Sequence, residues 1–393
     1  MTREIKVGSV VVGGGAPVSV QTMANVDPHD AAALVRQLES CAALGCEIFR
    51  LTVPDLEAAK TLGEVKKRSP IPLVADIHFD YRCALAAIEA GVDALRLNPG
   101  NIGSRERVQA VARAAKAKGV PIRIGVNAGS LEKDLREKRD YLSVHRFGES
   151  LAAPRPEAGR VTLRADSSDE STKDNAALLV ESAMRHVRLL EAEDFHDIVI
   201  SAKASNVAET LATYRMLAEK TEYPLHLGVT EAGTLIPGAV RNSVALGILL
   251  SEGIGDTIRV SLTARPEKEV KVGLEILRSL GLREPGPAIT SCPTCGRTKV
   301  DLQRIATQIE DALETLYHDR VSNLQPPTSN LQPRFPHVAV MGCAVNGPGE
   351  AKGADIALCG GDGEFLLYVK GEFVEKVKEE DAVRKVIERV VAL

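Results

Sequence analysis

Tryptophan is absent from this sequence, and all aromatic residues together make up only 3% of it. The core must therefore be built from aliphatic side chains, and proteins that stack single-stranded nucleic acid on aromatic rings are disfavoured. The sequence also lacks any apolar run of roughly 20 residues, the length that spans a membrane, and its first residues lack a secretory signal. The net charge of −4 gives no general attraction to nucleic acid or anionic membranes. These absences predict a cytoplasmic protein.

The length and composition of the chain indicate a globular protein of two domains. Of the 393 residues, 44% are hydrophobic and 26% are charged, which is typical of soluble folded chains. This length exceeds one ordinary core. Proline and glycine cluster in GLREPGPAITSCPTCG, so we predict one domain over residues 1–280 and a second over 285–393, with a hinge at 281–287.

Short apolar strands alternate with helix-length amphipathic segments through the first domain, after a predicted hairpin around the glycines at 13–15. Several of these helical segments end in glycine, as at Gly45, Gly91 and Gly119. This alternation predicts a (β/α)8 TIM barrel. The alternative, a doubly wound open sheet, is less favoured because no glycine-rich dinucleotide fingerprint follows the first strand. The predicted strands are residues 19–23, 47–53, 73–78, 94–99, 122–127, 197–203, 225–230 and 257–263.

Two further regions stand apart from this alternation. A charged, turn-rich insertion occupies about 131–172, for which we predict a solvated excursion with a small hairpin at HRFGES and RVTLRA. The second domain is predicted as a small α/β unit. Its expected elements are a helix at 300–319, a strand at 337–343, a hairpin at 364–377 and a final helix from 379.

Cationic side chains recur on the predicted barrel strands. Because the active site of such a barrel lies at the C-terminal ends of its strands, we expect five cations to meet at one mouth. Buried unpaired charge is costly, so these cations indicate an anionic ligand, most simply a diphosphate. The alternative is that each cation pairs with a carboxylate on the rim, but Asp76 and Glu231 are too few to neutralise the set. Glu231, a carboxylate among cations, is a candidate acid/base. The five cations are Arg50, Arg96, Arg123, Lys203 and Arg259.

Seven cysteines occur, an odd number that speaks against a disulfide framework. Three of them, at 41, 46 and 83, are expected to be buried core residues. In the second domain Cys292 and Cys295 form a CxxC turn, and Cys343 opens the glycine-rich loop GCAVNGPGE. Three thiolates without a second CxxC favour a 4Fe–4S cluster with one other ligand over a Cys₄ zinc site. Glu350 is the favoured fourth ligand, and Cys359 is the alternative.

The sequence resembles the bacterial, two-domain 4-hydroxy-3-methylbut-2-enyl diphosphate synthases along nearly its whole length. The insertion after Leu131 is longer and more charged than is usual in that family. The segments that carry the resemblance are FRLTVP, VADIHF, LRLNPGN, IRIGVNAGSL, ISAKASN, GVTEAG, IRVSLTARPEKEV, SCPTCGR and GCAVNGPGEAKGADI.

The resemblance implies a reaction and a set of roles. The reaction is the reductive ring opening and dehydration of 2-C-methyl-D-erythritol 2,4-cyclodiphosphate, with electrons from flavodoxin or ferredoxin. It implies that Glu231 is the acid/base, that Asn346 lies near cluster and substrate, and that homodimers place one subunit's cluster domain over the other's barrel. It also implies diphosphate binding by Arg50, Arg96, Arg123, Lys203 and Arg259 with Asn98, Asn127 and Ser261, and cluster ligation by Cys292, Cys295, Cys343 and Glu350.

A different class of enzyme remains open from the residues alone. A TIM barrel that carries no redox centre, such as a pterin-binding transferase or an aldolase using Lys203, would also bind an anionic substrate. Its second domain would then hold a structural zinc. A third reading, an electron carrier or sensor docked on a barrel scaffold, leaves Glu231 among the cations unexplained.

Overall fold

The computed structural model describes residues 1–98, 102, 104–152, 170–283, 286–322, 335–343 and 347–393. The chain divides into two compact units, 1–282 and 283–393, each described here by itself. The predicted hinge at 281–287 falls partly outside the described residues. Among the described helices, none is both long and apolar enough to cross a membrane.

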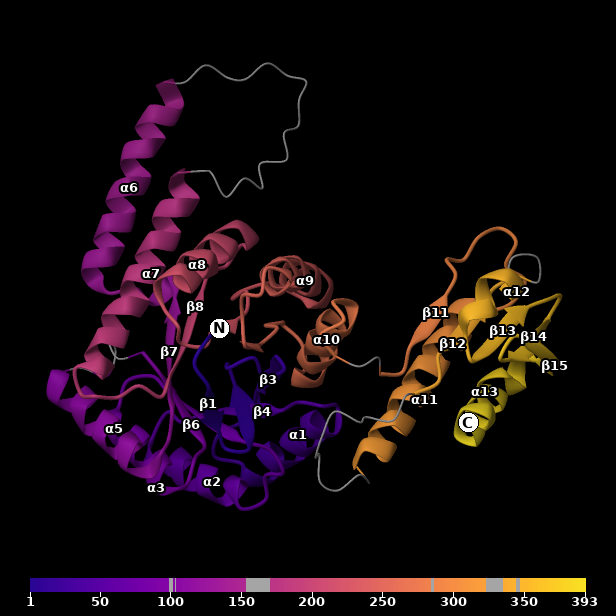
Figure 1. The fold of residues 1–393 in the computed structure, drawn as a ribbon, viewed down its shortest axis with the longest axis horizontal. Helices are drawn as coiled ribbons and strands as arrows, with labels where there is room; N and C mark the ends of the chain where they lie inside the picture. The colour runs from indigo at the N-terminus through magenta and orange to yellow at the C-terminus, as the bar shows by residue number, and fades with distance from the viewer. Residues whose placement is uncertain (99–101, 103, 153–169, 284–285, 323–334, 344–346) are drawn as a thin grey trace. The chain divides into compact units, whose positions relative to one another are not determined.

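Eight strands form the centre of the first unit and confirm the predicted TIM barrel (Figure 1). They pair in parallel in the order β8-β7-β6-β5-β4-β3-β10-β9. A single parallel bridge from Ile200 to Leu225 joins the two ends of this order and nearly closes the barrel. The strands are β3 (Ser19–Met23), β4 (Ile48–Thr52), β5 (Leu73–Ile77), β6 (Ala94–Leu97), β7 (Ile122–Asn127), β8 (Ile198–Lys203), β9 (His226–Leu227) and β10 (Thr257–Ile258).

The last two strands are shorter than predicted. At Gly228, directly after β9, the main-chain oxygen of Arg259 and the Lys203 ammonium approach so closely that a Cβ would not fit. Glycine is therefore required at this point, where the chain leaves β9 and enters the loops of the barrel mouth.

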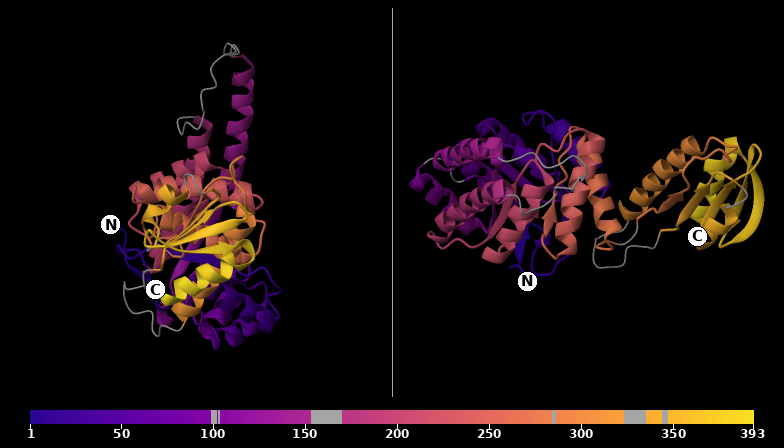
Figure 2. Two further views of the ribbon diagram at one scale, coloured as in Figure 1. Left: turned by 90° about the vertical axis from the view of Figure 1, so that its right-hand side faces the viewer. Right: turned by 90° about the horizontal axis from the view of Figure 1, so that it is seen from above.

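Helices surround the strands and bury one apolar stripe each against them (Figures 1 and 2). Side-chain oxygens of Asp30, Asp55 and Asn206 accept main-chain N–H bonds at three helix starts. The glycines at 45, 91 and 119 have positive φ at helix ends, as the sequence predicted. The barrel helices are α1 (Ala31–Ala43), α2 (Leu56–Lys66), α3 (Tyr81–Glu89), α5 (Arg105–Lys118), α7 (Glu170–Glu191), α8 (Val207–Lys220), α9 (Leu235–Ser251) and α10 (Pro266–Ser279).

A short hairpin closes the N-terminal end of the barrel. Strands β1 (Ile5–Val7) and β2 (Val10–Val12) pair antiparallel and turn at Gly8, whose φ is +57°. The predicted hairpin is present, but it turns at residues 8–9 and not at the glycines of 13–15, which form a separate turn after β2. Val7 and Val12 pack against Ile48, Val74 and Ala94, which lie at or near the starts of three barrel strands, and so form the barrel floor.

The insertion is helical where it is described. Residues 145–150, predicted as part of a hairpin, lie in α6 (Lys133–Ala152), whereas 160–165 lie outside the described residues. The helix forms because its charges find partners, such as Asp134 with Arg185 of α7 at 2.7 Å, and because Leu135 is buried. Helices α6 and α7 run side by side and extend beyond the other helices of this unit (Figures 1 and 2).

The second unit is a five-stranded mixed sheet in the order β11-β12-β13-β14-β15. Helices α11 and α13 cover one face of the sheet. Alternate strand residues, such as Val338 and Ile356, point to that face and pack against the helices. The short α12 and a 3₁₀ turn cover the other face, where Ala339 and Cys359 point. The elements are β11 (Ile289–Ser291), α11 (Leu302–Ser322), β12 (Val338–Met341), α12 (Gly347–Glu350), β13 (Ile356–Gly360), β14 (Glu364–Val369), β15 (Glu372–Lys378) and α13 (Ala382–Ala392).

Candidate active site

Four of the predicted cations lie in or directly after the barrel strands, and each is largely withdrawn from solvent. Arg50 is the third residue of β4, Arg96 the third of β6, Lys203 the last of β8, and Arg259 follows β10. Burial lowers the pKa of the Arg50 guanidinium to about 9, and the Arg259 and Arg96 charges add to this effect against the opposing pull of Asp76. Burial likewise holds the pKa of Lys203 well below its usual value, with Arg259, Arg50 and Arg123 as neighbouring cations. Charge of one sign is therefore concentrated inside the barrel.

Asp76 of β5 is the carboxylate at the centre of this group. Its Oδ1 lies 3.1 Å from Nη1 of Arg96, and its Oδ2 lies 3.6 Å from Nε of Arg50. The side chain is only 2% exposed. Burial alone would raise the pKa of this carboxyl, but Arg50 and Arg96 outweigh that effect and hold it below its usual range.

A second buried carboxylate, Glu269 of α10, was not among the residues singled out from the sequence. Its Oε2 lies 3.3 Å from Nε of Arg259 and accepts a hydrogen bond of 2.7 Å from Oγ1 of Thr22. The only signal in the sequence is a glutamate one turn into an amphipathic helix, between Pro266 and Val270, which are both buried. That pattern places Glu269 on the buried face of the helix, but it does not identify a partner on a strand.

The charges of the barrel interior do not balance among the described residues. Asp76 and Glu269 accompany five cations, and neither Lys203 nor Arg123 has a carboxylate within 4.0 Å in the described part of the chain. Buried cations without partners destabilise a fold unless an anion joins them. The interior is therefore suited to a ligand that carries several negative charges, such as a diphosphate.

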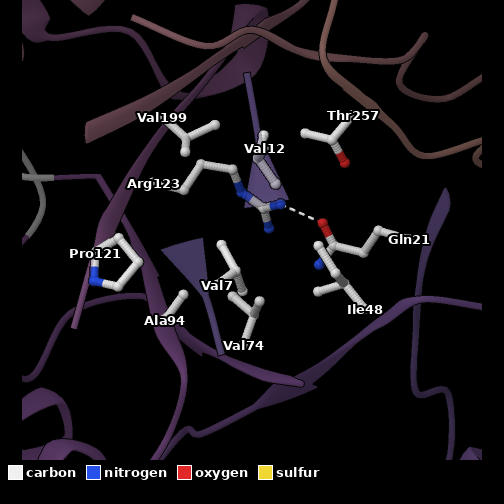
Figure 3. Close-up of a pocket in the computed structure, with 10 residues that line it drawn as sticks. All are labelled: Val7, Val12, Gln21, Ile48, Val74, Ala94, Pro121, Arg123, Val199 and Thr257. Carbon is white, nitrogen blue, oxygen red and sulfur yellow. Dashed lines mark hydrogen bonds between the residues drawn. The ribbon is translucent and has the colours of Figure 1, made fainter. Parts of the chain in front are cut away.

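Arg123 lies lower in the barrel than the sequence predicted. It is the second residue of β7, near the N-terminal end of that strand, so its predicted place at the C-terminal end was wrong. Its guanidinium donates to Oε1 of Gln21 beside a small cavity, and Figure 3 shows it directed towards Val7 and Val12 of the floor. Its Nε and Nη2 atoms have no partner among the described residues. A role of Arg123 in substrate binding stays a prediction.

Glu231 follows β9 in the segment that leads to α9. Its φ of +53° is in the left-handed region, which a residue with a side chain adopts at a cost of about 1 kcal/mol or more. A main-chain bond of 2.9 Å from Thr263 to Gly233 joins this loop to the segment after β10. This backbone conformation and the exposed side chain are compatible with a chemical role for Glu231, which stays a prediction.

The predicted polar partners lie along the same strand ends. Asn98 directly follows β6 and is 3% exposed. Asn127 ends β7 beside Lys203 in the strand register. Ser261 lies two residues after Arg259 and is half-buried.

Three cysteine thiols gather at one edge of the second unit. Cys292 follows β11 and Cys343 follows β12, and these two strands are parallel neighbours. The main-chain N–H of Gly342 donates to Sγ of Cys292 at 3.2 Å. A hydrogen bond from the Arg297 main chain lowers the pKa of the Cys295 thiol, and Cys343 is close enough to oppose that shift. Cysteine thiolates are the usual ligands of iron–sulfur clusters, so these three residues are candidate ligands of such a cluster.

The three cysteines fit an iron–sulfur cluster by the type of ligand they offer. In the described part of the chain, no three His, Cys, Asp or Glu side chains are placed to hold a single metal ion. Asn346 and the side chain of Glu350 lie outside what the structure describes, although the main chain of Glu350 ends α12. Cys359 is fully buried in β13, and a Cβ on Gly347 would meet its sulfur. That position favours a packing role for Cys359.

Together these features define a TIM-barrel protein with a cation-rich interior and a second α/β domain that carries three cysteines after two neighbouring strands. The family model described as "GcpE TIM-barrel domain" matches residues 2–274, and the model described as "GcpE protein C-terminal domain" matches 288–392. The chain therefore belongs to the GcpE family.

Relatives of known name match nearly end to end. A protein of Clostridium acetobutylicum named 4-hydroxy-3-methylbut-2-en-1-yl diphosphate synthase (flavodoxin) is 49% identical over 389 residues, which is 99% of this chain and 98% of the relative. A protein of the same name from Maridesulfovibrio salexigens is 50% identical over 380 residues, covering 97% of this chain and 93% of the relative.

Proposed function

We propose that this chain catalyses the reductive ring opening and dehydration of 2-C-methyl-D-erythritol 2,4-cyclodiphosphate to 4-hydroxy-3-methylbut-2-enyl diphosphate. The observation that carries this proposal is the barrel interior, where five cations accompany only two carboxylates among the described residues. The names of the relatives in Clostridium and Maridesulfovibrio give the same product and specify flavodoxin. The reaction breaks a carbon–oxygen bond of the ring, takes up two electrons and two protons, and releases one water.

The first task of the chain's residues in this proposal is to hold the diphosphate. Arg50, Arg96 and Arg259 each have unused guanidinium N–H groups for phosphate oxygens, since Asp76 and Glu269 occupy only part of each fork. Lys203 adds a charge without a carboxylate partner in the described part of the chain. Arg123, Asn98, Asn127 and Ser261 complete the proposed set of substrate contacts.

The second task is proton transfer. The hydroxyl group that leaves as water needs a proton, and Glu231 is the proposed donor. Glu231 lies in the loop after β9 at the barrel mouth with its side chain exposed, so its carboxyl can exchange protons with solvent and is open to a bound substrate. Asn346 is proposed to contact the substrate near the electron source.

The third task is to hold the proposed 4Fe–4S cluster, with Cys292, Cys295 and Cys343 as thiolate ligands and Glu350 as the fourth. When bound, the cluster would supply the electrons for the reduction, and these four residues would hold it. The N–H donated to Cys292 by Gly342 stabilises a thiolate in this position.

The proposed partners follow from electron supply. We propose that flavodoxin or ferredoxin delivers the electrons, because the names of the relatives specify flavodoxin. The proposed location of the enzyme is the cytoplasm. We also propose a homodimer in which the cluster domain of one subunit covers the barrel of the other. An apolar row along α9, formed by Ile236, Val240 and Val244, is exposed and offers a surface for subunit contact.

Anaerobic purification followed by metal and acid-labile sulfide assays tests the proposal against a non-redox barrel. We expect iron and sulfide in equal amounts and a visible absorbance that bleaches on reduction. Zinc without sulfide would favour a transferase or aldolase with a structural zinc module.

A further inference from the structure

We propose that Glu269 is a positioning residue that holds Arg259 and the adjoining main chain ready for the diphosphate. This inference rests on the proposed function, because it assigns a role within the same anion site. Glu269 is a buried residue of α10 and does not belong to the strands that carry the cations.

The two carboxylate oxygens of Glu269 accept four hydrogen bonds. Oε2 accepts from Oγ1 of Thr22 at 2.7 Å and from Nε of Arg259 at 3.3 Å. Oε1 accepts from Nη2 of Arg259 at 3.4 Å and from the main-chain N–H of Leu262 at 3.0 Å. The carboxylate therefore binds one edge of the guanidinium and leaves its other N–H groups available.

These contacts join three elements around the segment after β10. Thr22 belongs to β3, which pairs with β10, and Leu262 directly follows Ser261. The carboxylate of Glu269 thus holds two groups that flank Ser261 in the sequence. These are the side chain of Arg259 before it and the main-chain N–H of Leu262 after it. A phosphate ligand would meet donors whose positions are already set, which reduces the ordering cost of binding.

The charge of Glu269 opposes the binding of an anion, so charge and positioning act in opposite directions. If Glu269 acted only through its charge, Glu269→Gln would strengthen the binding of a diphosphate. If it positions Arg259, Glu269→Gln would weaken binding, because the new amide N–H₂ cannot accept from the guanidinium. The sign of the change therefore separates the two roles.

The experiment is calorimetric titration of the anaerobically purified full-length holoenzyme with the cyclic diphosphate. The variants are Glu269→Gln, Arg259→Ala, the double variant and, as a control, Glu275→Gln. Glu275 lies on the same helix, is 69% exposed and contacts only Arg278 among the ion pairs of the described chain. Cluster absorbance and the unfolding midpoint are recorded for each variant.

We expect Glu269→Gln to raise the dissociation constant by about 10- to 100-fold, by analogy with the loss of groups that orient a metal-ligating residue. The cluster spectrum and the affinity of the Glu275→Gln control should not change. In the Arg259→Ala background the same substitution should have less than about a twofold effect, because there is no guanidinium left to position. kcat should fall as KM rises, because the oxygen that leaves when the ring carbon–oxygen bond breaks belongs to the diphosphate that Arg259 is proposed to hold.

Equal or tighter binding by Glu269→Gln would overturn the inference, as would an undiminished effect in the Arg259→Ala background. If Glu269→Gln does not fold, Glu269→Asp tests the same point, because it keeps the charge and withdraws it by one methylene. Glu269→Asp should weaken binding several-fold, and wild-type affinity would contradict the proposal. Failure of the wild-type enzyme itself to bind the cyclic diphosphate would instead overturn the proposed function.

Discussion

Asp76 and Arg96 form an ion pair across neighbouring strands of the barrel, with 3.1 Å between Oδ1 and Nη1. Arg50 approaches the same carboxylate from the opposite neighbouring strand at 3.6 Å. One buried carboxylate therefore supports two cations that are proposed to bind substrate. The stability of the barrel and the shape of its anion site depend on the same residue.

Asp76→Asn is expected to destabilise the protein by about 3–5 kcal/mol, because it leaves two buried cations without their carboxylate. Urea unfolding of the protein, followed by circular dichroism, measures this change in the free energy of unfolding. Glu57→Gln, which removes an exposed pair with Lys60, serves as the control and should change stability by less than about 0.5 kcal/mol. Equal effects of the two substitutions would show that the Asp76 pairs carry no special weight.

Arg50→Ala and Lys203→Ala should each raise the dissociation constant of the cyclic diphosphate by about 30-fold or more. Loss of a charge-assisted hydrogen bond in a desolvated site typically costs about 2–5 kcal/mol. The cluster absorbance should be unchanged, since both residues belong to the barrel unit. Lys60→Ala on α2, where the side chain is 74% exposed, provides the control. Wild-type affinity in both variants would remove them from the proposed clamp.

Lys203→Met should stabilise the ligand-free protein even though it weakens substrate binding. Lys203 is 6% exposed, has cations for neighbours, and has no salt bridge in the described part of the chain. An apolar side chain of similar length removes this buried ionisable group and should raise the unfolding free energy by about 1 kcal/mol or more. Thermal unfolding with and without substrate measures the effect. A lower midpoint without ligand would indicate an anion or partner group already bound to Lys203.

Glu132, at the start of the insertion, should make the stability of the protein sensitive to acid. Burial raises the pKa of this carboxyl, but hydrogen bonds from His186 and Ser182 outweigh burial and lower it to about 2. Because the folded-state pKa is below the ordinary value of 4.5, the contribution is complete above about pH 5 and is lost as the pH falls towards 2. With allowance for solvent screening, it amounts to about 1–2 kcal/mol.

The measurement for Glu132 is urea unfolding of wild type and Glu132→Gln at several pH values. The wild-type advantage should be largest near neutrality and should shrink between pH 4.5 and 2. Glu137→Gln, at a 68% exposed position on α6, should leave the acid limb of the wild-type curve unchanged. A wild-type advantage that persists at pH 2 would contradict the assignment.

Serine substitutions at Cys292, Cys295 or Cys343 should each abolish or strongly reduce bound iron and acid-labile sulfide. Cys359→Ala should retain both, because Cys359 is a buried residue packed against Gly347. Glu350→Ala should weaken cluster retention or turnover. Loss of iron in Cys359→Ala with retention in Glu350→Ala would identify Cys359 as the fourth ligand.

The fold could be predicted from the sequence because the apolar pattern of the strands and that of the helices are both strong. Alternating aliphatic strands and glycine-terminated helices predicted the barrel, and its branched side chains form the observed core. The insertion was misread because α6 is stabilised by ion pairs such as Asp134 with Arg185, which a local reading of a charged segment does not reveal.

The same limit applies to the site. Cations on strands are visible in the sequence because buried charge is rare there, so Arg50, Arg96 and Lys203 were found. Glu269 was not found, because its importance comes from contact with Arg259 rather than from its own sequence context. Arg123 was found but placed at the wrong end of its strand, since residue type does not specify depth within a barrel.

The most direct test of the account is anaerobic turnover of 2-C-methyl-D-erythritol 2,4-cyclodiphosphate by the wild-type protein with a chemical reductant. We expect consumption of the cyclic diphosphate and formation of 4-hydroxy-3-methylbut-2-enyl diphosphate, with strong loss of activity in Glu231→Gln. An enzyme that retains iron and sulfide but leaves the cyclic diphosphate unchanged under these conditions would contradict the central claim.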